Sequence, residues 1–173
     1  PPSWATRSSP PASAARAVSE VRAVRVGKDE PLMPIARIIG TGAYVPERVL
    51  TNADLEKLVD TSDEWIVTRT GISERHIASD EQATSDLSYH ASRVALEAAG
   101  LDAAELDMIL VATATPDMAF PSTACVLQDR LGARKAGAMD LSAACTGFVY
   151  GLGMANGLIR SGQFRRMLVV GCE

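Results

Sequence analysis

The chain has 173 residues, a formal net charge of −4 from 17 Lys and Arg against 21 Asp and Glu, and a hydrophobic content of 47%. This length suits one domain of roughly 100–200 residues, and no basic cluster is long enough to indicate a nucleic-acid partner. The apolar runs are all far shorter than the roughly 20 residues that cross a bilayer. We therefore expect a cytoplasmic protein with no membrane or nucleic-acid partner.

Cysteine usage indicates a reducing compartment. The three cysteines, Cys125, Cys145 and Cys172, form an odd set without metal-type spacing, which favours free thiols over a disulfide framework. Neither His76 nor His90 is spaced with a cysteine as a zinc site requires. We expect no metal.

Residues 1–32 differ in composition from the rest of the chain. Pro, Ser, Ala and Arg dominate without apolar periodicity, so we expect this segment to be disordered. It resembles an Arg- and Ser-rich transit peptide, which would place the protein in a plastid. The alternative, which we favour, is upstream read-through with Met33 as the true start, so that residues 33–173 form the folded domain.

The folded part is predicted to begin with a strand at 35–39 and a tight turn at 40–42. Two short helices should follow near 52–59 and 62–68. Each is preceded by a threonine with an acidic residue three positions later, which is the spacing of a capping box: Thr51 with Asp54, and Thr61 with Glu64.

The clearest helix is predicted over 84–99, and Gly100 stands where it should stop. Its apolar residues recur at helical spacing and form one face: Leu87, Ala91, Val94, Ala95 and Ala98. The apolar run at 108–112 is typical of a strand buried on both faces. Pro121 should then open a helix that ends near Leu131.

The last predicted elements are a strand at 137–141, a helix at 149–159 and a strand at 167–170. Strands that alternate with helices indicate βαβ units and a mainly parallel, helix-covered sheet. We therefore expect an α/β fold. The chain opens without Met and stops just past an apolar strand, so we also expect a fragment.

The most informative candidate residue is Cys145, which lies between the strand at 137–141 and the following helix. A cysteine at such a junction faces unpaired backbone N–H groups and the positive end of the helix dipole. This environment favours the thiolate, which is the nucleophilic form. The alternative is a cysteine that serves as a small core hydrophobe.

Other small and sulfur-containing residues are assigned to packing. Gly147, Gly151 and Ala155 recur every four residues, a stripe that would let their helix pack closely as a central buried helix. Cys125 and Cys172 lie in apolar helix and strand patterns, and we expect both to pack in the core.

Trp65 and Arg69 are four residues apart and so share one helix face. An indole beside a guanidinium could stack on a nucleotide base and meet phosphate charge. On the residues alone, a half-buried Trp with an exposed Arg is the simpler explanation. Neither His76 nor His90 is placed by sequence as a base for Cys145.

From Ile38 to Gly171 the chain resembles the N-terminal half of β-ketoacyl-[acyl-carrier-protein] synthase III, a thiolase-fold condensing enzyme of bacterial-type fatty acid synthesis. The block from Asp60 to Ile72, which contains Trp65, is specific to this branch of thiolase-fold proteins. The other matching stretches are 51–56, 74–77, 119–122 and 143–148. The resemblance implies a thiolase-like α/β fold and an acyltransferase that acts as a homodimer.

The resemblance also implies a role for each site residue. Cys145 would take the acyl group of acetyl-CoA or another short acyl-CoA as a thioester, and malonyl-acyl-carrier-protein would accept it with decarboxylation. Trp65 would stack on the CoA adenine, Arg69 would lie near the CoA phosphates, and Thr61 would make a lesser contact. Phe120 would reach toward the partner's acyl pocket. No permanently bound cofactor is implied.

The family's catalytic His and Asn belong to its C-terminal half, and neither can be matched in this sequence. The resemblance therefore implies that these 173 residues alone are inactive, with a further strand and the second half of the fold outside the chain. Two alternatives stay open. One is a polyketide-type starter synthase that uses a larger acyl-CoA, and the other is a half-length module for acyl-CoA binding or dimerisation.

Overall fold

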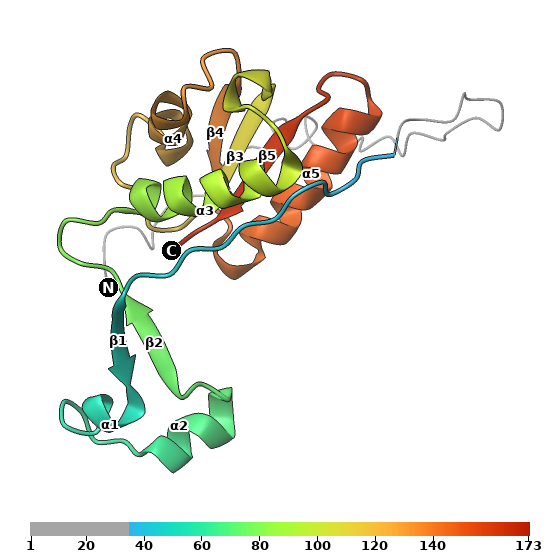
Figure 1. The fold of residues 1–173 in the computed structure, drawn as a ribbon. Coiled ribbons are helices and arrows are strands. Elements are labelled where there is room, and N and C mark those ends of the chain that lie inside the picture. Colours follow the sequence, from blue (N-terminus) through green and yellow to red (C-terminus); the bar gives the residue numbers. More distant parts are fainter. Residues whose placement is uncertain (1–34) are drawn as a thin grey trace, which may run out of the picture. The chain divides into compact units, whose positions relative to one another are not determined.

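The computed structural model describes residues 35–173 (Figure 1). The disordered extension or read-through expected at residues 1–32, and the proposed start at Met33, lie outside the described residues. Within the described part of the chain, no helix combines the length and apolar character needed to cross a bilayer.

A three-stranded parallel sheet forms the centre of the fold. Its strands are β3 (Met108–Ala112), β4 (Gly137–Leu141) and β5 (Met167–Gly171), in the spatial order β4–β3–β5. Both neighbours run parallel to β3 and pair with it in register along its whole length. The prediction of a parallel α/β sheet is confirmed.

β3 occupies the central position because its residues are apolar throughout, and all five are buried. Just before it, the carboxylate of Asp107 accepts hydrogen bonds from the backbone N–H groups of Arg165 (2.7 Å) and Arg166 (2.9 Å). These bonds lower the pKa of the Asp107 carboxyl group. One carboxylate thus fastens the start of β3 to the loop that leads into β5.

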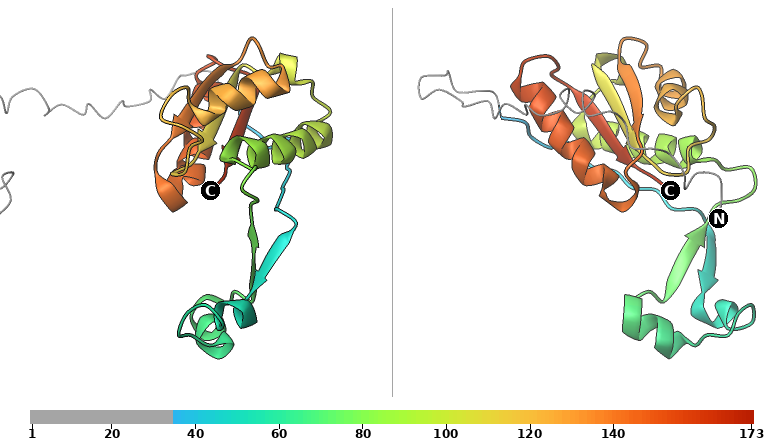
Figure 2. Two further views of the ribbon diagram at one scale, coloured as in Figure 1. Left: turned by 90° about the vertical axis from the view of Figure 1, so that its left-hand side faces the viewer. Right: turned by 180° about the vertical axis from the view of Figure 1, so that it is seen from behind.

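Helices cover both faces of the sheet (Figure 2). α3 (Thr84–Ala99) and α4 (Thr123–Leu131) pack on each other and on one face, and α5 (Gly147–Arg160) packs on β3 and β5 from the other. A short 3-10 turn, Ala103–Glu105, precedes β3. The core between α3, α4 and the sheet includes Leu96, Leu127, Ile109, Val111, Leu168 and Val170.

The buried face of α3 differs from the prediction. The helix has the predicted bounds and ends at Gly100 in the left-handed conformation (φ 61°), but Val94 of the predicted apolar face is 48% exposed. The prediction of the face is wrong because small hydroxyl side chains, rather than larger apolar ones, let α3 approach α4 and β5 closely. The buried residues are Thr84, Ser85, Ser88, Ser92 and Leu96.

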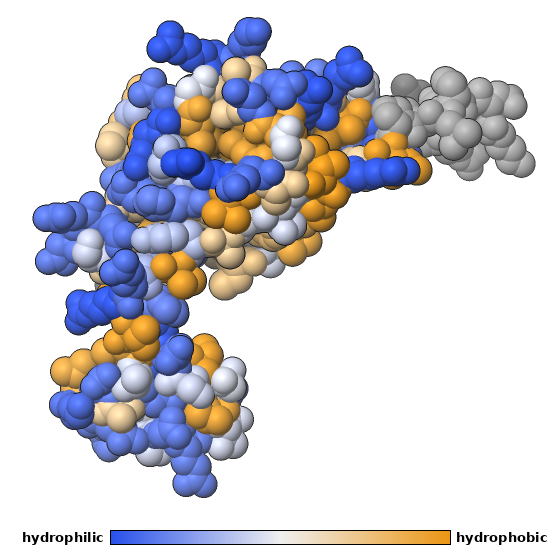
Figure 3. All heavy atoms as spheres, viewed as in Figure 1, coloured by the Kyte–Doolittle hydropathy of each residue, from blue (hydrophilic) through white to orange (hydrophobic). Residues whose placement is uncertain are grey.

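α5 meets the sheet along its small residues, as predicted. A Cβ atom added at Gly147 would lie 3.0 Å from Cβ of Ala112, and one added at Gly151 would lie 2.9 Å from Cγ1 of Val169. The expectation of a central buried helix is wrong for the described chain, since hydrophobic surface is exposed along α5 (Figure 3). Val149 and Met154 are among its exposed apolar side chains, and Phe148, 44% exposed, lies against Gly171 of β5.

A second, smaller group of elements precedes α3. β1 (Arg48–Thr51) and β2 (Glu74–Ile77) form an antiparallel pair, and between them the chain forms α1 (Asn52–Leu55) and α2 (Asp63–Thr70). The sequence did not predict these strands, because charged residues in β2 hide the alternation of a half-buried strand. The helices predicted at 52–59 and 62–68 are both present, but the first ends earlier, at Leu55, and the second spans Asp63–Thr70.

One of the two predicted capping boxes is correct. Thr51 Oγ1 accepts a hydrogen bond from the Asp54 backbone N–H (3.2 Å), and an Asp54 carboxylate oxygen accepts one from the Thr51 N–H (3.2 Å). The box predicted from Thr61 and Glu64 is wrong. Ser62 is the N-cap instead, and its Oγ accepts from the Trp65 backbone N–H (3.1 Å), because α2 begins one residue later than the spacing suggested.

The segment at 35–42 is neither a strand nor a tight turn. β4 and β5 are the edge strands of the sheet, and among the described residues the segment pairs with neither of them. It runs irregularly, with Ile38 72% exposed. Cβ atoms added at Gly40 and Gly42 would collide with the backbone of α3 at Ala95 and Ala91. The two glycines therefore serve a close approach to α3 rather than a turn.

α4 begins slightly later than predicted. Its N-cap is Ser122, whose Oγ accepts from the Cys125 backbone N–H (3.2 Å), so the first helical residue is Thr123. The Phe120–Pro121 peptide bond is cis. Because Ser122 is the N-cap, Pro121 lies in the loop that leads into the helix and does not open it.

Candidate active site

Cys145 lies at the strand–turn–helix junction that the sequence predicts. β4 ends at Leu141, a single 3-10 turn spans Ala144–Thr146, and α5 begins at Gly147. Cys145 is a free thiol and the one of the three cysteines that is classed as exposed. Within the described chain it is therefore not a buried core residue.

The backbone beside Cys145 is strained. Ala144 has φ of +44°, and among the described residues it is the one non-glycine residue with a positive φ. This conformation costs an L-residue about 1–2 kcal/mol, and such strain persists where the surroundings hold the chain firmly. On the other side of the cysteine, Thr146 Oγ1 donates a hydrogen bond to the Ala143 carbonyl oxygen (2.9 Å).

The strand that leads into the turn is firmly anchored. The two carboxylate oxygens of Asp140 accept hydrogen bonds from the backbone N–H groups of Thr123 and Ala124, each at 2.8 Å. These N–H groups belong to the first turn of α4, where an acceptor of negative charge is favoured. The Leu141 carbonyl accepts from the Thr113 N–H (3.2 Å), so the cysteine turn starts from a fixed point.

Polar side chains collect at the carboxyl ends of the parallel strands, which is where ligands bind in open α/β sheets. The Glu173 carboxylate accepts hydrogen bonds from the backbone N–H of Ala114 (3.1 Å) and from Thr115 Oγ1 (3.0 Å). Sequence reasoning missed this group. The available signal was a polar residue at the carboxyl end of each strand: Thr113, Ser142 and Glu173.

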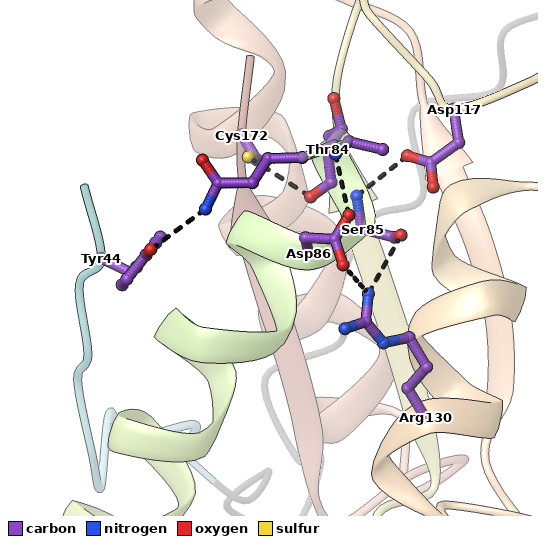
Figure 4. A network of polar contacts seen from close by, with 9 residues as sticks. Tyr44, Thr84, Ser85, Asp86, Asp117, Arg130 and Cys172 are labelled. Atoms are coloured by element: carbon purple, nitrogen blue, oxygen red, sulfur yellow. Dashed lines mark hydrogen bonds and ion pairs between the residues drawn. The ribbon is translucent and has the colours of Figure 1, made fainter. Parts of the chain in front are cut away.

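The other two cysteines are half-buried. Cys125 Sγ accepts a hydrogen bond from Ser122 Oγ (3.2 Å). Cys172 Sγ donates to the Thr84 carbonyl oxygen (3.6 Å), within the polar network at the start of α3 (Figure 4). Burial raises the pKa of the Cys172 thiol, which keeps it in the less nucleophilic protonated form.

That network ties α3 to its neighbours. Arg130 Nη1 of α4 donates to the Asp86 carboxylate (2.7 Å), and the Ser85 backbone N–H donates to Asp117 Oδ1 (2.9 Å) (Figure 4). The Ala83 backbone N–H bond, followed by the contact with Arg130, lowers the pKa of Asp86. The network secures the scaffold and does not contact Cys145.

Trp65 and Arg69 form the predicted pair on one face of α2. The Arg69 guanidinium carbon lies 4.7 Å from the centroid of the Trp65 ring, and the Trp65 side chain is 54% exposed. An open indole beside a cation can receive a flat ring and negative charge. Thr61 is half-buried two residues before the helix.

α2 is held mainly by polar contacts. Ile66 is its single buried residue, and burial of such a side chain contributes about 1.5–3 kcal/mol. Two hydrogen bonds fix the first helical residue, Asp63: its N–H donates to Glu56 Oε1 (2.7 Å), and its carboxylate accepts from Asn52 (2.7 Å). The bond with Asn52 is partly buried, and a hydrogen bond with a charged group contributes about 1.5–3 kcal/mol, so this bond weighs about as much as the apolar contact.

Phe120 is 87% exposed in the loop before α4. It lines an open hollow that also includes Met139, Cys125 and Ser142, and Ser142 lies three residues before Cys145. Phe120 is thus near the cysteine turn, whereas no contact within the described residues joins Trp65 or Arg69 to Cys145.

Neither histidine is placed as a base for Cys145. His76 Nδ1 is hydrogen-bonded with the Pro46 carbonyl oxygen (2.5 Å), and the exposed His90 ring stacks on Tyr44 with a centroid distance of 4.6 Å. In residues 35–173 no cluster of three or more His, Cys, Asp or Glu side chains could hold a metal ion.

The parallel sheet with a cysteine turn after β4 places the chain among the thiolase-like α/β proteins. A solved 3-oxoacyl-[acyl-carrier-protein] synthase III from Aquifex aeolicus is 54% identical with a TM-score of 0.75, over 78% of this chain and 43% of that one. The priming β-ketosynthase of a polyketide biosynthetic pathway is 40% identical with a TM-score of 0.78, over 86% of this chain and 43% of that one.

Sequence comparisons match the chain to proteins of the same name. The family model described as 3-Oxoacyl-[acyl-carrier-protein (ACP)] synthase III matches residues 139–173. The β-ketoacyl-[acyl-carrier-protein] synthase III of Xanthomonas oryzae pv. oryzae is 62% identical over 138 residues, or 80% of this chain and 42% of the relative. Over 138 residues the chain is thus similar to β-ketoacyl-[acyl-carrier-protein] synthase III proteins, and it spans less than half the length of these relatives.

Proposed function

We propose that the protein is a condensing acyltransferase that starts type II fatty acid synthesis, with Cys145 as the acyl acceptor. The observation that carries the proposal is the exposed thiol of Cys145 in a strained turn between β4 and α5. Nucleophiles require accessibility and a fixed orientation, and this turn provides both. Similarity to β-ketoacyl-[acyl-carrier-protein] synthase III proteins supports the acyl-transfer chemistry.

The first half-reaction transfers the acyl group to the cysteine. The Cys145 sulfur attacks the carbonyl carbon of acetyl-CoA or another short acyl-CoA, a carbon–sulfur bond forms, and the bond to the CoA sulfur breaks. CoA leaves as a thiol with the proton that the cysteine gives up. Cys145 lies just before the first turn of α5, whose N-terminal backbone N–H groups suit the negative charge that develops on the carbonyl oxygen.

The second half-reaction forms the carbon–carbon bond. Malonyl-acyl-carrier-protein loses CO₂, and the electron pair released attacks the acyl carbonyl carbon. The bond to Cys145 breaks, which gives a β-ketoacyl-acyl-carrier-protein and a Cys145 thiolate that takes up a proton from solvent. The His and Asn that the resemblance assigns to enolate stabilisation have no counterpart in this sequence, so residues 1–173 alone are not expected to perform this step.

Trp65 and Arg69 are proposed to bind the nucleotide end of CoA. Their 4.7 Å contact and exposed face suit an adenine that stacks on the indole and phosphates that meet the guanidinium. Thr61 would add a weaker contact, and Phe120 would reach the partner's acyl pocket in a homodimer. The protein would work in the cytoplasm without a permanently bound cofactor.

The test is an acylation assay on the full-length protein, read by intact mass. Incubation with acetyl-CoA should add one acetyl group that hydroxylamine removes, because a thioester is labile. Cys145→Ser should abolish this adduct, while the matched control Cys125→Ser should retain it. A hydroxylamine-labile adduct that persists in Cys145→Ser would refute the assignment of the nucleophile.

A second candidate is a polyketide-type starter synthase that uses a larger acyl-CoA. The structural match to the priming β-ketosynthase, at a TM-score of 0.78 over 86% of this chain, supports this second candidate. Competition between acetyl-CoA and longer acyl-CoA esters for Cys145 would separate the two enzymes. CoA binding without an adduct on Cys145 would instead support the non-catalytic module.

A further inference from the structure

We propose that Asn52 is a positioning residue of the acyl-CoA site. Its side-chain amide ties the first turn of α2 to β2 and so holds the Trp65–Arg69 pair in the orientation that receives the nucleotide. The inference rests on the proposed function, because it concerns how that same site is held in place.

Asn52 is 1% exposed, and its side chain is fully hydrogen-bonded. Nδ2 donates to Asp63 Oδ1 (2.7 Å) and to the Ile72 carbonyl oxygen (2.9 Å). Oδ1 accepts from Arg75 Nη1 (2.7 Å). A side-chain amide has two N–H donors and one carbonyl acceptor, so every group is used.

An amide is the side chain that this location requires. It stands between the carboxylate of Asp63 in α2 and the guanidinium of Arg75 in β2, and it offers a donor to the first and an acceptor to the second. A carboxylate at position 52 would repel Asp63. An apolar side chain would leave the half-buried Arg75 guanidinium without its acceptor at position 52, which is costly, whereas the exposed Asp63 carboxylate would bind water in place of the amide.

The contact reaches the nucleotide pair through a short path. Asp63 is the first residue of α2, Trp65 is two residues further on, and Arg69 follows one turn later. Because Ile66 is the single buried residue of α2, apolar packing alone leaves the helix free to rotate or tilt. The bond from Asn52, together with the exposed bond from the Asp63 N–H to Glu56, restricts this freedom and so helps to set where the indole and the guanidinium point.

The test compares variants of the full-length protein by calorimetric titration with CoA and by acylation kinetics. Asn52→Ala should weaken CoA binding about tenfold, equivalent to about 1.4 kcal/mol, and raise KM for acetyl-CoA, while the acylation rate at saturation stays unchanged. The matched control is Asn156→Ala, which removes an exposed amide from α5. A fall in the saturated rate with unchanged KM would overturn the proposal.

An exchange of the two side chains separates positioning from general stability. Asn52→Asp alone should weaken CoA binding, because two carboxylates would meet. The double variant N52D/D63N should recover part of the binding, since the introduced carboxylate accepts from Arg75 and from the introduced amide, while the Ile72 carbonyl oxygen still lacks its donor. Failure of the double variant to bind better than Asn52→Asp would contradict the inference, even if Asn52→Ala does not fold.

Trp65→Ala distinguishes a failure of the proposed nucleotide site from a failure of the role assigned to Asn52. If Trp65→Ala binds CoA as the unmodified protein does, the proposed nucleotide site is wrong and the inference fails with it. If Trp65→Ala loses binding while Asn52→Ala retains it, the site is correct and only the role of Asn52 is refuted.

Discussion

The two parts of the candidate site, Cys145 and the Trp65–Arg69 pair, are held in place by different kinds of contact. Cys145 follows β4 in a sheet whose central strand is wholly buried, whereas Trp65 and Arg69 stand on a helix with one buried residue and a polar anchor at its start. Apolar packing is non-directional, while hydrogen bonds to charged groups fix an orientation. The nucleophile is thus held in place by a packed core, whereas the proposed nucleotide-binding pair is held by directional polar contacts.

The sharpest way to test this contrast is to remove apolar volume from the core. Leu127 has no exposed surface, and Leu127→Ala should lower the free energy of unfolding by about 2–5 kcal/mol through lost burial and a cavity. Denaturant unfolding measures the change. Leu58→Ala, at a side chain 70% exposed, should stay within about 0.5 kcal/mol; equal effects would show that the core does not dominate.

A second test adds volume where α5 meets the sheet. Gly151→Val places atoms 2.9 Å from Val169 Cγ1 or closer, and it should lower the free energy of unfolding by about 1–3 kcal/mol through overpacking. Gly153→Ala is the control, because nothing lies within 4 Å of its added Cβ. It should stabilise the helix by about 0.5–1 kcal/mol. A tolerated Gly151→Val would mean that α5 does not pack as described.

A third test concerns the polar half. Ser62 caps α2, so Ser62→Ala should lower the free energy of unfolding by about 1 kcal/mol. Thermal unfolding or the helical signal in circular dichroism would report it. Thr61→Ala should change stability by less than about 0.5 kcal/mol, and the reverse ranking would reinstate the capping box that the sequence suggested.

The smallest expected effect is on pH dependence at α1. The hydrogen bond from Lys57, followed by those from Thr51, lowers the pKa of Asp54 from 3.8 to about 2. A lowered pKa stabilises the folded state above pH 3.8, and this contribution is lost as the pH falls toward 2. Titration of the Asp54 carboxyl by NMR should show it, and Lys57→Ala should move the midpoint upward. An unchanged midpoint would refute the role of Lys57.

Local signals were sufficient for much of the fold. The helix of α3 and its stop at Gly100, the buried run of β3, and the turn around Cys145 all follow from residue spacing within a short window. The pairing of Trp65 with Arg69 follows from helix geometry in the same way. These features depend on neighbours along the chain, which the sequence displays directly.

Features that depend on distant partners were not predictable. The face that α3 buries is decided by α4 and β5, and whether 35–39 forms a strand depends on its pairing with an edge strand of the sheet, β4 or β5. Asn52 gives no local sign of its partners, which lie 11 to 23 residues away. Similarly, the positive φ of Ala144 arises from the join between β4 and α5 and not from its own side chain.

The strained backbone at Ala144 limits evolutionary and engineering freedom beside the nucleophile. With φ of +44°, the residues that position 144 tolerates are determined by their backbone preferences and not by the space around the side chain. Glycine is permitted there, and β-branched residues are excluded even if the neighbouring space is empty. A search for altered acyl acceptance should therefore vary the residues around this turn and leave position 144 unchanged.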